Sequence, residues 1–334
     1  MPRTFFSRCV PETCGIANAR RYACHMNTPA EKTSLSLRAL LMRSFVHAVM
    51  RPTLAMPIGP AARAKLEQLA KLLWMARGTK VTQGQLGGVP VEWVANPVAG
   101  ARGFVLYLHG GAYVTGSPRT HRGLTSRLAR DARVCVAVPD YRLAPEHPHP
   151  AAVDDALAAY KGLLAQDIPP HKIVIAGDSA GGGLSLALAL RLKAEPLPQP
   201  AGIVLLSPFT DAALDSASMQ SPTQKEWLLT KPLMFAAVKD YAAGQDLRTP
   251  TISPLFANLT GLPPIFIQVG TDEVLLDDST RLAQAATKQG VPVTLQIWPR
   301  LWHVWQLHGG QMPEADRAIS AIAGFVHGRL TGKL

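Results

Sequence analysis

The chain passes from a short apolar run into a serine-containing turn at residues 173–183, which read Ile-Val-Ile-Ala-Gly-Asp-Ser-Ala-Gly-Gly-Gly. The first four residues predict a buried strand, and the stretch that begins near Leu184 predicts a helix. The middle of the run is therefore a Gly-x-Ser-x-Gly motif in the strand, turn and helix context that this motif requires. Small residues at Gly177 and Gly181 let the strand and helix approach, and the strained turn lifts the hydroxyl of Ser179 above the sheet.

A second glycine-rich motif, His109-Gly110-Gly111-Ala112-Tyr113, directly follows the predicted strand 104–108. Glycines at such a place let backbone N–H groups approach a substrate oxygen closely. We predict that an oxyanion is held by the N–H groups of Gly111, Ala112 and Ala180, the last at the start of the helix after the serine. Either motif alone can be an ordinary tight loop that arises by chance, but the two together favour catalysis.

Apolar strand-like runs and helical patterns alternate on both sides of this turn. The predicted strands are residues 89–94, 104–108, 134–138, 173–176, 203–206, 265–269 and 293–298. The predicted helices among and after them are residues 151–165, 182–193, 276–289 and 313–328. This order predicts an α/β fold with a mostly parallel central sheet flanked by helices, and ligands bind beyond the carboxyl ends of such strands.

The other members of a serine, acid and histidine triad should follow the serine in that order, each after a later strand. Asp272 and His303 occupy such positions, after the last two predicted strands. We therefore predict Asp272 as the orienting carboxylate and His303 as the general base. Asp277 and Asp278 fall in a predicted helix and are expected to face solvent, while His308 is the rival histidine.

These residues predict acyl transfer by covalent catalysis. His303 would take the proton of Ser179 as the serine attacks an acyl carbon, and would return it to the leaving alcohol. Asp272 would fix the tautomer of the imidazole, and water would then release the acyl group.

Segments outside the predicted sheet divide the chain into five parts. Residues 1–25 form a predicted disordered tail, and residues 26–80 carry two amphipathic helices. Residues 81–209 and 251–334 form the two parts of the catalytic core. Residues 210–250 separate two strands without one compact crossover and, with the N-terminal helices, are expected to form a cap.

The charge of the chain is uneven. It holds 34 Lys and Arg against 23 Asp and Glu, a formal net charge of +11, and residues 1–80 alone hold 13 of the basic residues and 3 of the acidic ones. The basic residues alternate with leucine at helical spacing, which is typical of a solvated helix face. No nucleic-acid-binding motif accompanies them, so we predict no nucleic-acid partner.

No stretch reaches the roughly 18 uninterrupted apolar residues of a membrane span, and residues 1–25 lack an apolar signal core. We therefore expect a cytoplasmic protein without stable membrane association. Four cysteines are too few for a disulfide scaffold. Cys9, Cys14, Cys24 and His25 form a formal zinc-ligand set, but the adjacent Cys24 and His25 fit the usual ligand spacing poorly, so no metal is predicted.

The motifs taken together resemble the hormone-sensitive lipase family of bacterial esterases. The likeness rests on the His-Gly-Gly motif, Asp140-Tyr-Arg-Leu-Ala-Pro-Glu146, Gly177-Asp178-Ser179-Ala180-Gly181 and the late acid and histidine. It spans roughly residues 35–330. It implies an α/β-hydrolase fold with a helical cap, hydrolysis of short- to medium-chain carboxylic esters without a cofactor, and frequent homodimers.

The chain departs from this family at Ala112, where the family usually has glycine. The N–H group is kept, but the methyl group is expected to restrict φ and to crowd the pocket. We interpret Asp178 and Glu146 as structural partners rather than as additional acids or bases.

Two other functions stay open at this level. A noncatalytic small-molecule binding protein can use the same scaffold, although the retained serine, acid and histidine argue against it. An amidase or lactone hydrolase would use the same triad, and the fold cannot separate these from an ester hydrolase.

Overall fold

The computed structural model of the chain describes residues 25–26, 34–97 and 100–333. Its strands are β1 His25–Met26, β2 Lys80–Leu86, β3 Val89–Ala95, β4 Phe104–Leu108, β5 Cys135–Pro139, β6 Ile173–Asp178, β7 Gly202–Leu206, β8 Ile265–Gly270 and β9 Val293–Trp298. Its α-helices are α1 Leu37–Phe45, α2 Arg51–Leu54, α3 Pro60–Ala70, α4 Arg122–Asp131, α5 Ala151–Leu164, α6 Ala180–Ala194, α7 Ala217–Gln220, α8 Lys231–Ala242, α9 Leu276–Lys288 and α10 Pro313–Thr331. All the predicted strands are present.

The strands form one sheet in the order β1-β9-β8-β7-β6-β4-β5-β3-β2. Strand β3 pairs antiparallel with β2 and with β5, and the other neighbours run parallel. The prediction of a mostly parallel sheet is confirmed. Strand β2 was not predicted because it lies at the sheet edge and exposes most of its side chains, which leaves no apolar run in its sequence.

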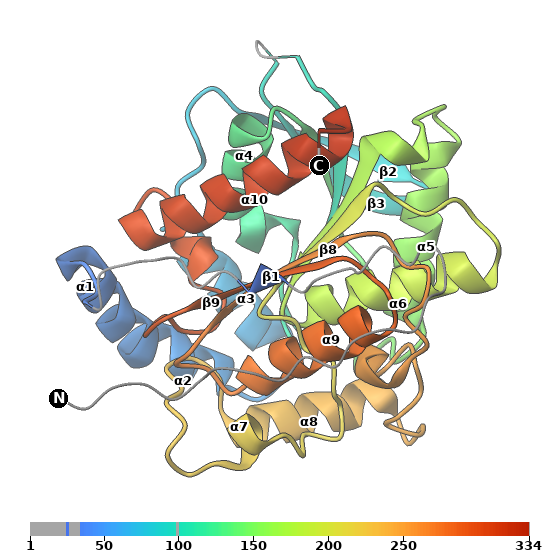
Figure 1. Cartoon of the computed structure of the whole chain (residues 1–334). Helices are drawn as coiled ribbons and strands as arrows, with labels where there is room; N and C mark the ends of the chain where they lie inside the picture. The colour runs from blue at the N-terminus through green and yellow to red at the C-terminus, as the bar shows by residue number, and fades with distance from the viewer. Residues whose placement is uncertain (1–24, 27–33, 98–99, 334) are drawn as a thin grey trace, which may run out of the picture.

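Alternate residues of β6 point to opposite faces of the sheet. Val174 and Ala176 pack together with residues of α4 and α10, whereas Ile173 and Ile175 pack with residues of α5 and α6. Figure 1 shows α4 and α10 on one side of the sheet and α5, α6 and α9 on the other. The central strands are thus buried on both faces, which explains why their sequences are almost wholly apolar.

Two segments outside this core line a cavity beyond the carboxyl ends of the strands. Met50 and Leu54 line it from the first segment, and Leu228 lines it from the second. We call residues 34–79 the N-terminal cap segment and residues 210–250 the inserted cap segment. The division of the whole chain into five parts stays a prediction.

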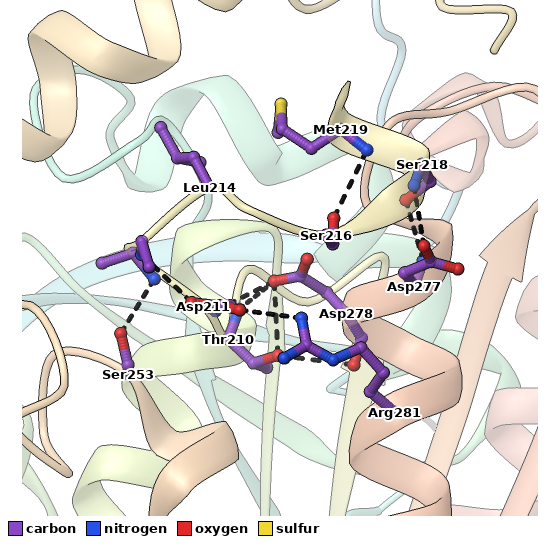
Figure 2. Close-up of polar contacts among 12 residues, drawn as sticks. Thr210, Asp211, Leu214, Ser216, Ser218, Met219, Ser253, Asp277, Asp278 and Arg281 are labelled. Carbon is purple, nitrogen blue, oxygen red and sulfur yellow. Dashed lines mark hydrogen bonds and ion pairs between the residues drawn. The ribbon is translucent and has the colours of Figure 1, made fainter. Parts of the chain in front are cut away.

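Buried carboxylates anchor the inserted cap segment to the first turns of α9 (Figure 2). Asp278 accepts hydrogen bonds from the backbone N–H groups of Thr210 and Asp211, at 2.7 and 3.0 Å. The carboxylate of Asp211 in turn forms an ion pair with Arg281, at 2.8 Å. The segment therefore starts from a fixed point next to the loop that follows β8.

The prediction that Asp277 and Asp278 face solvent is wrong for Asp278, which is 2% exposed. Asp277 is half-buried and accepts the backbone N–H of Ser218 at 2.7 Å. The inserted cap segment covers this turn of α9, and the carboxylates satisfy its backbone donors. The sequence of α9 alone does not show that the inserted cap segment buries this turn.

We expect Asp278 to make the stability of the protein depend on pH. Burial, reinforced by the neighbouring Asp211 and opposed by the N–H groups of the segment, raises the pKa of Asp278 to about 7. Between the ordinary pKa of an aspartate and about 7, the folded protein keeps a proton that the unfolded chain has lost. The free energy of unfolding should therefore fall as pH rises through this range.

Asp278→Asn removes this titration, so the thermal midpoint of the parent should fall more steeply than that of the variant between about pH 4 and pH 7. Scanning calorimetry of both proteins at several pH values measures the difference. Parallel pH profiles would show that Asp278 ionises as freely in the folded protein as in the unfolded chain.

No helix in the described ranges is long and apolar enough to cross a membrane. Within the same ranges, no group of three or more His, Cys, Asp or Glu side chains is placed to hold a metal ion. The cysteines of the formal zinc set, Cys9, Cys14 and Cys24, lie outside the described residues, and His25 belongs to β1.

Candidate active site

Ser179 lies at the turn between β6 and α6 in a backbone conformation that favours glycine, with φ 52° and ψ −121°. Its N–H donates to the carbonyl of Leu206 at 2.8 Å, and its own carbonyl accepts the N–H of Phe209 at 2.9 Å. Contacts with the chain around the end of β7 thus hold the strained turn in place. A side chain at Gly181 would collide with the backbone of Leu108. The predicted strand, turn and helix around the serine are confirmed.

The side chains of Ser179 and His303 are hydrogen-bonded, with 2.9 Å between the serine Oγ and the histidine Nε2. Ser179 is 8% exposed and His303 is 3% exposed. His303 lies on the loop after β9, where Val304 adopts φ 50° and donates its N–H to the hydroxyl of Ser207. The structure therefore brings together two of the three residues predicted as a triad.

The prediction that Asp272 orients His303 is wrong. The histidine Nδ1 lies 2.8 Å from Oε2 of Glu273, the next residue along the chain. Glu273 is fully buried, and its Oε1 accepts hydrogen bonds from the hydroxyl of Ser207 at 2.8 Å and from the N–H of Gly270 at 2.7 Å. These contacts fix the carboxylate that faces the imidazole.

Asp272 points elsewhere because adjacent side chains leave the loop after β8 in different directions. Its N–H donates to the carbonyl of Leu301, and its carboxylate accepts from the hydroxyl of Thr271 at 3.1 Å and from the indole N–H of Trp227 at 3.5 Å. An acid after β8 was predicted correctly, but two consecutive carboxylates differ only by one position. The sequence contains no signal for which of the two faces the histidine.

Ser207 is a site residue that sequence reasoning missed. It directly follows β7 with φ 45°. Its hydroxyl donates to Glu273 and accepts the N–H of Val304, so it joins the acid to the loop that carries His303. Ser179, Ser207, Glu273 and His303 thus follow β6, β7, β8 and β9, four adjacent strands of the sheet. A polar residue at the end of an apolar strand was the one available sign of Ser207.

The loop after β4 lies beside Ser179 and lines the same cavity. Gly111 has φ 127° and Ala112 has φ 55°, both in the range that favours glycine. The carbonyl of Gly111 accepts the N–H groups of Val114 and Thr115, which closes the turn. The expected restriction of Ala112 is therefore a strained left-handed conformation.

Asp178 joins this loop to the serine turn. Its Oδ1 accepts the N–H of Gly110 at 3.0 Å and the hydroxyl of Tyr107 at 2.8 Å, and it lies 3.2 Å from Nε2 of His121. Burial disfavours both charges, yet their attraction prevails, so the pKa of Asp178 is lowered and the pKa of His121 is raised. This is a structural role, as predicted for Asp178.

Two further motif residues support the loop. His109 stacks on Tyr141 with ring centroids 4.2 Å apart, and its Nδ1 lies 2.9 Å from the carbonyl oxygen of Gly110. Burial lowers the pKa of His109 to about 3, so it is neutral at physiological pH. Glu146 forms an ion pair with Arg63 of the N-terminal cap segment at 2.7 Å, which agrees with the structural role predicted for it.

Glu226 connects the two cap segments to the loop after β8, which carries Glu273. The sequence did not predict this residue as part of the site. One oxygen of this carboxylate accepts the N–H groups of Leu228 and Leu229, and the other accepts the N–H of Val274 at 3.0 Å. Arg51 of α2 donates to the carbonyl of Glu226 at 2.7 Å. The residue after Glu273 is thus hydrogen-bonded to the inserted cap segment.

A narrow cavity of about 120 Å³ extends from Ser179 beneath both cap segments. Phe209 and residues of α8, among them Met234 and Val238, give it a mostly apolar wall. A serine hydrogen-bonded to a histidine, next to a glycine-rich loop and an apolar cavity, is an arrangement suited to acyl transfer.

The rival histidine, His308, does not contact the serine hydroxyl, which is bonded to His303. Its ring lies next to that of Trp302, with 5.9 Å between centroids, and it is 5% exposed. Burial lowers the pKa of His308 to about 4.

A family model described as the alpha/beta hydrolase fold matches residues 105–307 of the chain. The chain is 44% identical to an acetyl-hydrolase of Streptomyces hygroscopicus over 241 aligned residues. The alignment covers 72% of this chain and 80% of that protein. The chain is also 38% identical over 285 residues to an esterase of Acinetobacter venetianus, which covers 84% and 93% of the two chains.

Solved structures agree with these relatives. An esterase from the bacterial hormone-sensitive lipase family superposes with a TM-score of 0.84 at 36% identity, over 89% of this chain and 99% of the other. A hormone-sensitive lipase from a metagenome library has a TM-score of 0.81 at 40% identity, over 86% and 98%. The chain therefore belongs to the α/β-hydrolase fold family and, within it, to the carboxylic-ester hydrolases of the hormone-sensitive lipase type.

Proposed function

We propose that this hydrolase cleaves short-acyl carboxylic esters through an acyl-enzyme on Ser179. The observation that carries the proposal is the continuous hydrogen-bonded series from the Ser179 hydroxyl through His303 to Glu273, with distances of 2.9 and 2.8 Å. A nucleophile, a base and an orienting acid in this order are the requirement for activating a serine at neutral pH.

In the proposed reaction, His303 takes the proton of Ser179 as its oxygen attacks the acyl carbon. The N–H groups of Gly111, Ala112 and Ala180 hold the oxyanion, each donor being worth about 10²- to 10³-fold in rate. His303 then gives the proton to the leaving alcohol, and water repeats the cycle on the acyl-enzyme. Glu273 keeps the imidazole in the reactive tautomer and offsets its positive charge.

The narrow cavity next to Ser179 supports a short acyl group. A volume of about 120 Å³ is well below that of cavities that take drug-sized ligands. The Streptomyces relative is named as an acetyl-hydrolase, which points the same way. The homodimer and the cytoplasmic location stay predictions from the sequence.

Hydrolysis of p-nitrophenyl esters from acetate to palmitate tests the proposal. The protein should prefer the shortest esters, and its activity should fall steeply as the acyl chain outgrows the narrow cavity. If the folded protein cleaves no ester but binds them, the noncatalytic binding protein becomes the better description. If it cleaves the matching anilides faster than the esters, it is an amidase.

The pH profile of this activity should report the protonation of His303. Burial alone lowers the pKa of His303, but its hydrogen bond to Glu273 and the charge of that carboxylate outweigh the effect, so the pKa is raised above its ordinary value of 6.5. The base is therefore protonated and inactive below that raised pKa. We expect kcat/KM to increase with pH through a midpoint above 6.5, measured between about pH 5 and pH 9. A midpoint below 6.5 would contradict this coupling.

A further inference from the structure

A second, wider cavity opens beside His303. Its volume is about 620 Å³, against about 120 Å³ for the narrow cavity next to Ser179. Its walls come from α1, α3 and the loop after β9. This volume lies in the range of about 300 to 1,000 Å³ that drug-sized ligands occupy, so the wide cavity has room for a large group.

The two cavities meet at the histidine. The residues that line both are Met50, Leu73, Leu228, His303, Val304 and Leu307. Ser179, Gly111 and Ala112 line the narrow cavity and are not among the residues that line the wide one. An ester bound at the serine therefore has the proposed oxyanion donors on one side and the histidine on the other.

The chemistry of the proposed reaction decides which half of the ester lies on which side. When the bond between the acyl carbon and the alcohol oxygen breaks, that oxygen takes the bonding electron pair and receives the proton from Nε2 of His303, so the alcohol leaves neutral. The alcohol oxygen must therefore be next to His303, and the rest of the alcohol extends beyond it.

We propose that the wide cavity is the alcohol subsite and that the natural substrates are short-acyl esters of bulky, largely apolar alcohols. This inference rests on the proposed function and adds the substrate class to it. The acyl half is limited by the narrow cavity, whereas the alcohol half has about 620 Å³ available.

Most residues that line the wide cavity are apolar, although Arg38 also lines it. Leu41, Leu72 and Trp74 line it and are 65%, 49% and 66% exposed, an unusual density of exposed large apolar side chains. Covering such surface is favourable in proportion to the apolar area removed from water, so a bulky apolar alcohol gains affinity here that a small one cannot.

The rival histidine lies at the wall of the wide cavity. His308 and Gln311 line it, and the histidine Nδ1 and the glutamine Oε1 have, apart from each other, no hydrogen-bond partner among the described residues. Both side chains are uncharged near neutral pH, because the pKa of His308 is lowered to about 4. Neither side chain therefore places a charge against an apolar alcohol.

The test compares ethyl acetate with naphthylethyl acetate, two esters of primary alcohols that differ in the bulk of the alcohol. For the parent protein, kcat/KM should be at least about tenfold higher for the naphthylethyl ester, since burial of a ring system of this size contributes more than one such factor. Leu69→Trp, on the wall of the wide cavity alone, should reduce the ratio of the two values by about tenfold.

Two matched variants identify the subsite. Leu37→Trp makes the same change on α1 at a residue that is 73% exposed and is not among the residues that line either cavity, so the ratio should stay that of the parent. Ala237→Leu narrows the other cavity and should reduce the ratio of ethyl butyrate to ethyl acetate instead. Circular dichroism and thermal midpoints establish that each variant is folded.

The outcomes distinguish a failure of the proposed esterase function from a failure of the alcohol subsite. If the folded parent cleaves neither acetate, the proposed function fails. If it cleaves both at similar efficiency, the alcohol subsite is wrong while the esterase stands. If Leu69→Trp changes the ratio of ethyl butyrate to ethyl acetate and leaves the ratio of naphthylethyl acetate to ethyl acetate unchanged, the wide cavity holds the acyl half of the ester. That result would overturn the inference.

Discussion

Replacement of Ser179 by alanine is expected to lower kcat/KM for p-nitrophenyl acetate by about 10⁴-fold or more. Without the hydroxyl, His303 has no proton to take and no covalent intermediate forms, so only the oxyanion donors and the cavity remain to assist attack by water. Steady-state rates at matched enzyme concentration, with the uncatalysed rate subtracted, measure the loss.

Ser185→Ala is the matched control. It is the same change in the same helix, at a fully buried serine whose hydroxyl donates to the carbonyl of Gly181 and does not line the cavity. Its activity should stay within several-fold of the parent, because one internal hydrogen bond is worth about 1 kcal/mol of stability and no catalytic step. A Ser179→Ala protein that kept more than about one per cent of the parent activity would remove Ser179 as the nucleophile.

The second large effect is expected at the acid. Glu273→Gln should reduce kcat/KM by about 10³- to 10⁴-fold, the scale seen when the orienting carboxylate of a serine triad is made neutral. The amide lacks the charge that stabilises the imidazolium, and it can hold the imidazole in the wrong tautomer. It also meets the donors of Ser207 and Gly270, which favour an oxygen with full negative charge.

Asp272→Asn is the neighbouring control and decides between the two carboxylates. Its side chain contacts Thr271 and Trp227 rather than the imidazole, so a loss of no more than about tenfold is expected. The low-pH limb of the activity should also move to lower pH in any residual activity of Glu273→Gln and stay in place for Asp272→Asn. A greater loss at Asp272 than at Glu273 would restore Asp272 as the acid.

The buried strands could be predicted because both of their faces are covered, which leaves an apolar run that stands out from its surroundings. Helix α4 could not be predicted in this way. Its apolar stripe is short, with Leu124 and Leu128, and the buried positions between them hold Thr125, Ser126 and Arg127. A polar residue buried by tertiary contacts has no periodic signature, so a pattern of apolar residues cannot reveal the helix.

The candidate site likewise contains residues that the sequence could predict and residues that it could not. Ser179 and the glycine-rich loop could be predicted because strained turns restrict which residues fit. Glu273 and Ser207 depend on the direction in which a side chain leaves a loop, and a shift of one residue changes that direction. Asp278 is buried by a segment far away in the sequence, and Glu226 accepts the N–H of Val274, 48 residues along the chain. Only the packed chain shows these two contacts.

The hydrogen bond between Glu226 and the N–H of Val274 has a consequence for protein engineering. The residues that carry the reaction lie between positions 109 and 303, whereas much of the wall around the substrate belongs to two segments that could be exchanged for those of a relative. A chimaera that replaced residues 210–250 without keeping a carboxylate at Glu226 would lose the support behind the acid and become a poor catalyst for every substrate. When the cap segments are exchanged among relatives, Glu226 should therefore be kept together with the catalytic residues.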